Sequence, residues 1–466
     1  MVAALLLVGC TSSSGPDGDQ GAAPSTGPAP TGMAAGIRRH LDALQEAADR
    51  NGGNRAAGTP GYDASVRYVA DQLRRAGYRP EVQRFDATTA RNRSAPLLEL
   101  PGTSAAPRAD EDFRPFAFSG NGEVAAASRP VDLAAGAATS TSGCEPSDFA
   151  GFPRGGIAVL QRGTCPFRAK AQNAQQAGAA GAVIFDPGQP GVLAGTLGGP
   201  GITIPVLAVT PAVARRLTGA NAGQQARVRV DVESRSHPTS NVLAELPGSG
   251  DRVVMVGAHL DSVPAGAGMN DNASGSATVL ELARQLAATR PTATVRFAWW
   301  GSEELGLLGS RHYLEQLARA ERDRIALYLN LDMVGSRNAQ RLVYDGAARG
   351  APPGSRVIQQ VLTDHLRGQG LAVGTTSLGG GSDHAPFAAA GIPVGGLYTG
   401  AGEVKSRQQA EQFGGAAGQP ADPCYHRRCD DLDNLDLTVL GQMADAAAHA
   451  VATFARDPAA VDRPRG

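Results

Sequence analysis

Histidine and acidic residues stand in short polar motifs over the second half of this 466-residue chain. The motifs are HLD at 259–261, NDN at 270–272, EE at 303–304, NLDM around Asp332 and CYHRRC at 424–429. Imidazole and carboxylate groups without thiolate suit Zn²⁺ or a related divalent ion. Two such ions about 3.5–4 Å apart need a bridging carboxylate and terminal ligands on each side. The motifs supply that set, whereas the sequence contains no HExxH zinc motif and no Walker-type phosphate loop.

Each motif also has an ordinary structural explanation, because an Asp after a strand often caps a helix and adjacent glutamates often lie on a solvated helix face. Their placement favours a functional site. The strand-like runs RVVMVGAH, TVRFAWW and IALYLNLDMV end close to His259, Glu303 and Asp332. The carboxyl ends of parallel strands meet at one edge of a sheet, where α/β proteins bind ligands. We therefore expect these three residues to share one site.

The elements that would position these residues alternate regularly from Asn241 onward. Strand-like runs are separated by stretches with apolar residues at helical spacing. Helical patterns cover 37–50, 62–76, 273–288, 304–319, 355–366 and 437–454. This order predicts an α/β fold in which a mostly parallel central sheet carries helices on both faces. Residues 105–232 differ, since short β-like runs stand there among Ala- and Gly-rich stretches.

The composition excludes several classes of protein. Basic and acidic side chains nearly cancel, with 43 Lys and Arg against 44 Asp and Glu. This balance argues against nucleic acid as a partner, because nucleic-acid binding needs a positive excess. No apolar run reaches the roughly 18 residues of a membrane-spanning helix. The 60 glycines and 31 prolines indicate many loops and turns.

Residues 1–10, MVAALLLVGC, form a short apolar run that resembles a bacterial lipoprotein signal. In that interpretation Cys10 carries the lipid, and residues 11–36, rich in Ser, Gly and Pro, form a flexible tether. An ordinary secretion signal is the alternative, and no Lys or Arg precedes the apolar run, so the basic region that begins such signals is missing. In both cases we expect an exported protein, either attached to the cell membrane through a lipid anchor on Cys10 or secreted.

The remaining four cysteines fall into two local pairs, Cys144 with Cys165 and Cys424 with Cys429. Export brings a chain into an oxidising compartment, where disulfides are the default. Neither pair has the CxxC spacing of a structural zinc site. The sequence therefore predicts two disulfides.

Residues 240–454 resemble the secreted bacterial double-zinc aminopeptidases, which are co-catalytic zinc exopeptidases. The resemblance rests on motifs in the family's order: GAHLDSV, GAGMNDNASGSA, RFAWWGSEELGLLGS, YLNLDMVGS, SDHAPF, GIPVGGLYTGAG and CYHRRCDDL. It implies the zinc exopeptidase fold and a metallo-aminopeptidase that hydrolyses N-terminal residues, large apolar ones such as Leu, from peptides. Two Zn²⁺ per chain are the implied cofactors.

The same resemblance implies a role for individual residues of these motifs. The implied ligands are His259, Asp271 and Asp332 for one zinc ion and Asp271, Glu304 and His426 for the other. Asp271 would therefore bridge the two ions. Glu303 would be the general base that deprotonates the water held between them.

Further residues of the motifs would support the reaction. Asp261 would fix the tautomer of His259 from outside the ligand set. Tyr425 would donate a hydrogen bond to the developing oxyanion. The resemblance also implies a cis peptide bond between Asp271 and Asn272.

The last zinc ligand has two candidates. Spacing alone would nominate His384 in SDHAPF, whereas the resemblance favours His426 in the disulfide-closed CYHRRC loop. His384 would then lie beside the substrate pocket, together with Tyr398 of GLYTG.

Residues 105–235 resemble a protease-associated domain, on the pieces CEPSDFAG, GGIAVLQRGTCPFRAKAQNAQQAGAAGAVIF and IPVLAV. Cys144 and Cys165 stand at the usual disulfide positions of that domain. The catalytic domain would then be split into residues 37–104 and 236–457. The insert carries no catalytic groups, so we expect it to act as a lid or as a filter of substrate size.

Alternative functions can be weighed on particular residues. Gly381 stands where relatives often carry an arginine, and a carboxypeptidase on this scaffold would need such a cation for the substrate carboxylate. A glutaminyl cyclase would use one zinc ion, and a receptor-like binding protein would have lost ligands that are all present here. Asp445 is present but Gly441 replaces the second acidic residue of a calcium site found in some relatives, so no calcium is predicted.

Overall fold

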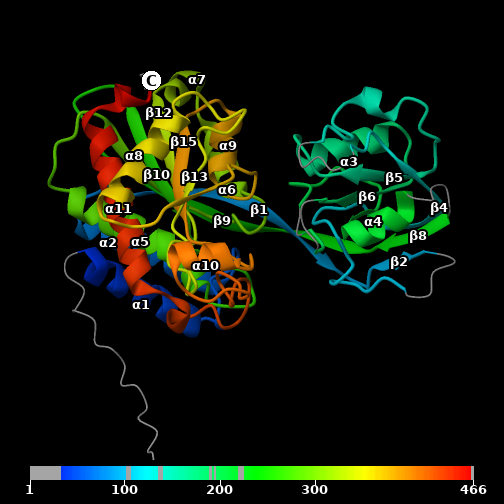
Figure 1. The fold of residues 1–466 in the computed structure, drawn as a ribbon, viewed down its shortest axis with the longest axis horizontal. Coiled ribbons are helices and arrows are strands. Elements are labelled where there is room, and N and C mark those ends of the chain that lie inside the picture. The colour runs from blue at the N-terminus through cyan, green and yellow to red at the C-terminus, as the bar shows by residue number, and fades with distance from the viewer. Residues whose placement is uncertain are drawn as a thin grey trace, which may run out of the picture.

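A computed structural model describes residues 33–100, 106–134, 140–187, 191–193, 196–218 and 225–462. Two α/β bodies lie side by side and are joined by a ribbon of two long antiparallel strands, β1 (Glu81–Asn92) and β9 (Val232–Leu246) (Figure 1). The proposed lipid-bearing Cys10 and most of the expected tether lie outside the described residues. Within the described part of the chain, no helix is both long and apolar enough to cross a membrane.

The larger body is built on an eight-stranded sheet with the order β1-β9-β11-β10-β12-β15-β13-β14. Its remaining strands are β10 (Val253–His259), β11 (Thr294–Trp300), β12 (Ile325–Leu331), β13 (Leu342–Tyr344), β14 (Gly374–Thr376) and β15 (Val394–Tyr398). The central strands β11, β10, β12 and β15 are parallel, which agrees with the prediction. Antiparallel pairs lie toward both edges, at β1/β9, β9/β11 and β13/β15.

Helices cover both faces of this sheet, because successive strand residues point to opposite sides. Along β10, Val254 and Val256 enter one apolar core, and Val253 and Met255 enter the other. The first core is covered by α1 (Met33–Asp49), α2 (Pro60–Arg75), α5 (Ser274–Leu286), α8 (Ser355–Gly368) and α11 (Leu437–Arg456). The second core is covered by α6 (Leu308–Gln316) and α9 (His384–Ala389), and short α7 (Arg319–Asp323) and α10 (Arg407–Phe413) complete the body.

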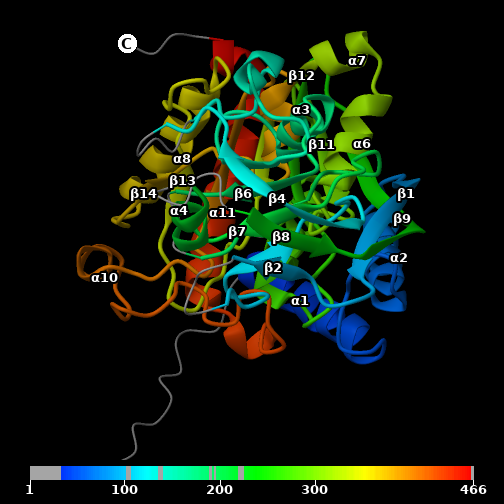
Figure 2. The same ribbon diagram turned by 90° about the vertical axis from the view of Figure 1, so that its right-hand side faces the viewer.

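The smaller body contains a seven-stranded sheet with the order β2-β8-β4-β5-β6-β7-β3. Its strands are β2 (Leu97–Glu99), β3 (Phe113–Pro115), β4 (Gly122–Pro130), β5 (Ile157–Gln161), β6 (Gly181–Phe185), β7 (Val206–Val209) and β8 (Gln225–Val230). Figure 2 shows α3 (Phe167–Gln176) and α4 (Pro211–Thr218) separated by this sheet, and each helix packs into its own apolar core. The predicted Cys144–Cys165 disulfide is present in this body, with a Cα–Cα distance of 5.7 Å.

One predicted helix begins later than expected. The pattern predicted a helix over 304–319, but α6 begins only at Leu308 and the preceding residues form turns. The physical reason is the backbone, because Ser302, Gly306 and Leu307 have φ values of 60°, 107° and 62°. Those left-handed conformations are incompatible with an α-helix. The EE dipeptide therefore lies on a turn and not on a helix.

Candidate active site

Three neighbouring strands bring the predicted site residues to one edge of the larger sheet. His259 is the last residue of β10, which lies between β11 and β12. Glu303 and Glu304 follow the end of β11, and Asp332 follows the end of β12. The strands run parallel, so their carboxyl ends lie together as predicted.

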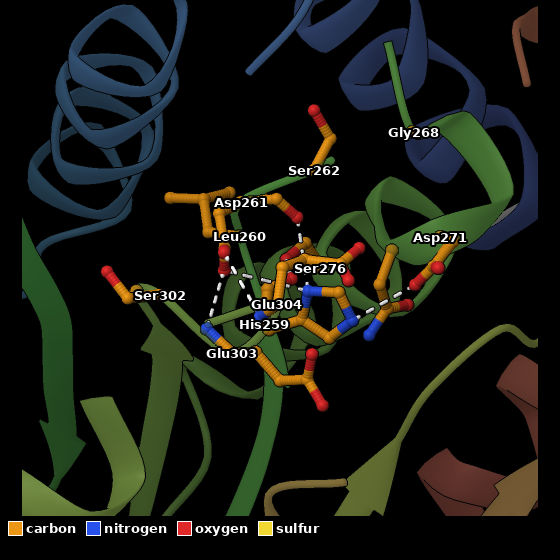
Figure 3. Close-up of polar contacts among 12 residues, drawn as sticks. His259, Leu260, Asp261, Ser262, Gly268, Asp271, Ser276, Ser302, Glu303 and Glu304 are labelled. Atoms are coloured by element: carbon orange, nitrogen blue, oxygen red, sulfur yellow. Dashed lines mark hydrogen bonds and ion pairs between the residues drawn. The ribbon is translucent and has the colours of Figure 1, made fainter. Parts of the chain in front are cut away.

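The Nε2 nitrogen of His259 faces two carboxylates. Nε2 lies 3.1 Å from Oδ1 of Asp271 and 3.3 Å from Oδ1 of Asp332. Its other nitrogen, Nδ1, lies 3.1 Å from the main-chain carbonyl oxygen of Asp261 and can donate a hydrogen bond to it (Figure 3). The residue is 1% exposed, so its orientation is set by these contacts and by packing.

Asp271 lies between two imidazoles. While Oδ1 faces His259, Oδ2 lies 3.1 Å from Nε2 of His426, and the same Nε2 lies 3.1 Å from Oε2 of Glu304. Asp271 thus presents one oxygen to each side of the cluster. Its peptide bond to Asn272 is cis, as expected.

The two adjacent glutamates face different partners. Ligand atoms of His259, Asp271 and Glu304 all lie within 4.8 Å of one another, and so do those of His259, Glu303 and Asp332. Figure 3 shows the two glutamate side chains leaving the turn in different directions. The turn thereby sends Glu304 toward Asp271 and Glu303 toward Asp332.

Asp261 makes a different contact from the one expected. Its carboxylate lies 3.7 Å from Nδ1 of His259, beyond hydrogen-bond distance, and the main-chain carbonyl accepts from that nitrogen instead. The carboxylate oxygens accept from the main-chain amides of Glu303 at 3.1 Å and Glu304 at 3.3 Å. A buried Asp261 therefore holds the turn that carries both glutamates.

The charges of this cluster favour a bound cation. Four carboxylates, those of Asp271, Glu303, Glu304 and Asp332, meet only two imidazoles. Burial and the Asp271 carboxylate raise the pKa of Glu304 to about 7, and burial raises the pKa of Glu303 well above its usual range. Buried Oε1 of Glu304 and Oδ1 of Asp332 have no hydrogen-bond partner among the described residues. Oxygen and imidazole donors with unmatched negative charge fit a divalent metal such as Zn²⁺.

His426, and not His384, lies with these carboxylates. His384 is 3% exposed, and its Nε2 lies 2.7 and 2.9 Å from the carbonyl oxygens of Leu378 and Gly379. Its ring packs against Tyr344 with a centroid distance of 4.5 Å. His426 instead reaches the cluster from the loop closed by the predicted Cys424–Cys429 disulfide, which is present.

Two tyrosines were predicted to lie near the substrate. The ring of Tyr425 stacks on His426 with a centroid distance of 3.9 Å, so it lies beside the cluster. The Tyr398 hydroxyl donates to the Glu403 carboxylate at 3.0 Å. A Cβ on Gly402 would lie 3.7 Å from Tyr425, so the turn that carries Glu403 packs beside that ring.

A buried polar network that the sequence did not predict holds the His426 loop. Asp430 accepts the main-chain amides of Asn270 at 2.8 Å and Asp271 at 3.0 Å. Asp422 accepts the Asn270 side chain at 2.6 Å and the Cys424 amide at 2.8 Å. The only signals in the sequence were the asparagines of NDN and the Asp that follows CYHRRC.

Comparison with known proteins places the chain in a family. The model of peptidase family M28 matches residues 241–451, and the PA domain model matches residues 122–217. An aminopeptidase of Pseudomonas aeruginosa is 42% identical over 450 residues, which cover 92% of this chain and 82% of that protein. The chain belongs to peptidase family M28. Its PA domain lies within the smaller body.

Other M28 relatives agree with this assignment. The probable lipoprotein aminopeptidase LpqL of Mycobacterium tuberculosis is 41% identical over 431 residues, which cover 90% of this chain and 84% of that protein. The solved aminopeptidase from Aneurinibacillus sp. strain AM-1 is 29% identical with a TM-score of 0.68, and the match covers 91% of this chain and 94% of that one. The M28 chain is therefore a metallo-aminopeptidase with an inserted PA domain.

Proposed function

We propose that this M28 aminopeptidase binds two zinc ions and releases large apolar N-terminal residues, such as Leu, from peptides. The observation that carries the proposal is the position of Asp271, with one oxygen facing His259 and the other facing His426. A carboxylate that offers one oxygen to each of two imidazole-containing ligand sets suits a two-metal site.

The ligand assignment follows the two sides of Asp271. His259 and Asp332 would complete one zinc site, and Glu304 and His426 would complete the other. When bound there, zinc polarises the scissile carbonyl and lowers the pKa of a water molecule toward about 7. Buried Oε1 of Glu304, which has no hydrogen-bond partner among the described residues, supports this assignment, because buried carboxylate oxygens usually have partners.

Glu303 would transfer a proton from the attacking water to the leaving amine. Its carboxylate is grouped with His259 and Asp332 and is outside the proposed ligand set. It would take a proton from the attacking water and pass it to the amine that leaves. Tyr425, stacked on His426, would donate a hydrogen bond to the oxygen of the scissile carbonyl as negative charge develops there.

The protein would work outside the cytoplasm, as a lipoprotein anchored through Cys10 or in secreted form. The two disulfides support an oxidising compartment. The similarity to a relative named a lipoprotein aminopeptidase supports the anchored form.

The proposal is tested with the purified full chain by zinc analysis and chromogenic amides. We expect about two zinc ions per chain, rapid hydrolysis of leucine p-nitroanilide, and none of N-acetyl-leucine p-nitroanilide, which lacks a free amine. Chelation should abolish the activity and added zinc should restore it. Faster turnover of Lys or Asp amides would overturn the specificity. A single zinc with cyclisation of N-terminal glutamine would favour the cyclase, and hydrolysis of the N-blocked amide would contradict an aminopeptidase.

A further inference from the structure

Arg55 is a buried arginine for which the mechanism above has no role. It lies in the loop NGGNRAAGT between α1 and α2 and is 0% exposed. More than 200 residues separate it in sequence from the segment that it contacts, with separations of 205 to 213. An arginine is seldom fully buried unless its N–H donors are hydrogen-bonded. The hydrogen-bond partners of Arg55 therefore indicate its role.

Within the described part of the chain, the hydrogen-bond partners of the Arg55 side chain are main-chain carbonyls of one segment. Nε donates to Ala267 at 2.8 Å, Nη2 donates to Gly268 at 2.7 Å, and Nη1 donates to Leu260. This segment, 260–268, is the connection between the proposed ligands His259 and Asp271. The guanidinium fork thus joins the start of that connection to its end.

The backbone of Arg55 binds the middle of the same segment. Its amide donates to the Ser262 hydroxyl at 3.0 Å, and its carbonyl accepts from the Ser262 amide at 3.2 Å. Gly268 is closely surrounded, since its φ of 65° favours glycine and a Cβ added to it would lie only 2.3 Å from the Asp271 carbonyl oxygen. The path from His259 to Asp271 therefore has little freedom.

Nearby carboxylates also stabilise the Arg55 guanidinium in this position. The carboxylates of Asp261, Asp271 and Asp430 all interact favourably with the guanidinium, and they partly offset the cost of its burial. Burial lowers the pKa of Arg55 to about 10, so the group is still a cation at neutral pH. Lysine could supply the charge but not the planar fork, because three carbonyls in different directions need several fixed N–H groups.

We propose that Arg55 is a positioning residue of the metal centre: its fork sets the spacing of His259 and Asp271 by clamping segment 260–268. The proposal rests on the proposed zinc function. It also gives a reason why the chain before the PA domain belongs to the catalytic body, since that part supplies the clamp.

The test compares Arg55→Lys with Arg168→Lys. Arg168 offers a matched control, because its side chain also donates to three main-chain carbonyls, those of Leu197, Gly199 and Pro200 in the smaller body. Zinc release from the holoenzyme to a chelator is measured together with the melting temperature. We expect Arg55→Lys to weaken zinc binding about 10–100-fold, with activity regained in excess zinc, and Arg168→Lys to leave zinc affinity unchanged.

A milder variant keeps the proposal testable if Arg55→Lys does not fold. Ser262→Ala removes the hydroxyl that accepts from the Arg55 amide and that donates to the Gly266 carbonyl at 3.0 Å, and it should speed zinc release several-fold. Unchanged zinc release in both folded variants would overturn the clamp, and so would unchanged release in Ser262→Ala alone when Arg55→Lys is unfolded. A wild-type chain without zinc or aminopeptidase activity would instead overturn the proposed function, so the two failures are distinguishable.

Discussion

At the residue scale, two adjacent glutamates meet different partners because of their surroundings. Glu303 and Glu304 are adjacent, and the Asp261 carboxylate holds both of their amides. The left-handed backbone at Ser302 and Leu307 keeps them out of a helix. Glu304 consequently meets His426, whereas Glu303 groups with His259 and Asp332.

Because the two glutamates meet different partners, we expect one conservative substitution to lower kcat and the other to lower zinc content. Glu303→Gln keeps size and hydrogen bonding but cannot accept a proton, so kcat should fall roughly 10²–10⁴-fold with near-native zinc content and KM. Glu304→Gln should lose one zinc ion, because a neutral amide is a poor ligand for it. Steady-state kinetics and metal analysis on both variants check this. Turnover of Glu303→Gln within about tenfold of wild type, or zinc loss in that variant, would refute the assignment.

At the element scale, the His426 loop is secured both by its disulfide and from outside it. Asp422 and Asp430 flank the Cys424–Cys429 ring and bind Asn270 and the Asp271 amide. Asn434 donates to both aspartates, at 2.9 and 3.0 Å. The loop and Asn270, the residue beside Asp271, thus form one buried unit.

Removal of the disulfide should therefore affect metal binding more than folding. In a Cys424→Ser/Cys429→Ser variant, the flanking aspartates keep the loop attached but His426 and Tyr425 become less ordered. We expect weaker zinc binding at the His426 side, by about tenfold, with a small change in melting temperature. The Cys144→Ser/Cys165→Ser variant is the control and should keep its zinc. Full zinc content and activity without the Cys424–Cys429 bridge would show that the bridge has no functional role.

A buried histidine, His40, lies where helices α1, α2 and α5 pack together. His40 on α1 is 2% exposed, lies 2.8 Å from the Tyr68 hydroxyl on α2, and has its Nε2 3.3 Å from the Glu281 carboxylate on α5. Burial outweighs Glu281 and lowers the pKa of His40 to about 4. The folded chain therefore keeps this histidine neutral at a pH where the unfolded chain protonates it.

The sign of the pH effect follows directly. Between pH 6.5, the ordinary histidine value, and about 4, only the unfolded chain binds this proton, so the free energy of unfolding falls as the pH is lowered. The free energy of unfolding falls by at most about 3 kcal/mol, and it stops falling below about pH 4, where the folded chain also binds the proton. His40→Gln should remove that part of the acid sensitivity in chemical denaturation. Equal slopes for wild type and His40→Gln would contradict the assignment.

At the scale of the whole molecule, the smaller body contacts the catalytic turn directly. A Cβ on Gly306 would lie 2.2 Å from Cγ2 of Thr196, so glycine is needed where that threonine approaches. Gly306 donates its amide to the Glu303 carbonyl at 2.7 Å. Thr196 is held by the next residue, Leu197, whose amide donates to Ala117 at 2.9 Å. The insert expected to act as a lid or a filter therefore also abuts the turn of Glu303.

A bulky side chain in place of Thr196 should lower the catalytic rate through the turn that carries Glu303. Thr196→Trp would push the turn and misplace Glu303, so kcat should fall about tenfold or more while zinc content stays native. Thr203→Trp, at an exposed position of the same body, is the control. Wild-type kcat in Thr196→Trp would show that the contact is not coupled to catalysis.

The sequence by itself determined the α/β order, the disulfide pairs and the residues that meet at the strand ends. Those features follow from periodic patterns and residue types, which placed His259, Glu303 and Asp332 at one edge of the sheet. Only the family resemblance added Asp271 to the predicted ligands. Spacing alone nominated His384 as the last ligand, and the family resemblance favoured His426. Only the tertiary structure shows His426 against Asp271, with His384 bound to carbonyls.

Contacts with the main chain were decided by tertiary structure alone. Arg55 binds three carbonyls and Asp430 binds two amides. The Asp261 carboxylate binds the amides of the glutamate turn, and it is the Asp261 main-chain carbonyl that faces the His259 ring. Every residue type except proline carries the same amide and carbonyl groups, so such partners leave no pattern in a sequence. The turn at Glu303 escaped prediction for a related reason: left-handed φ at Ser302 and Leu307 is imposed by surrounding packing, and neither residue type signals it.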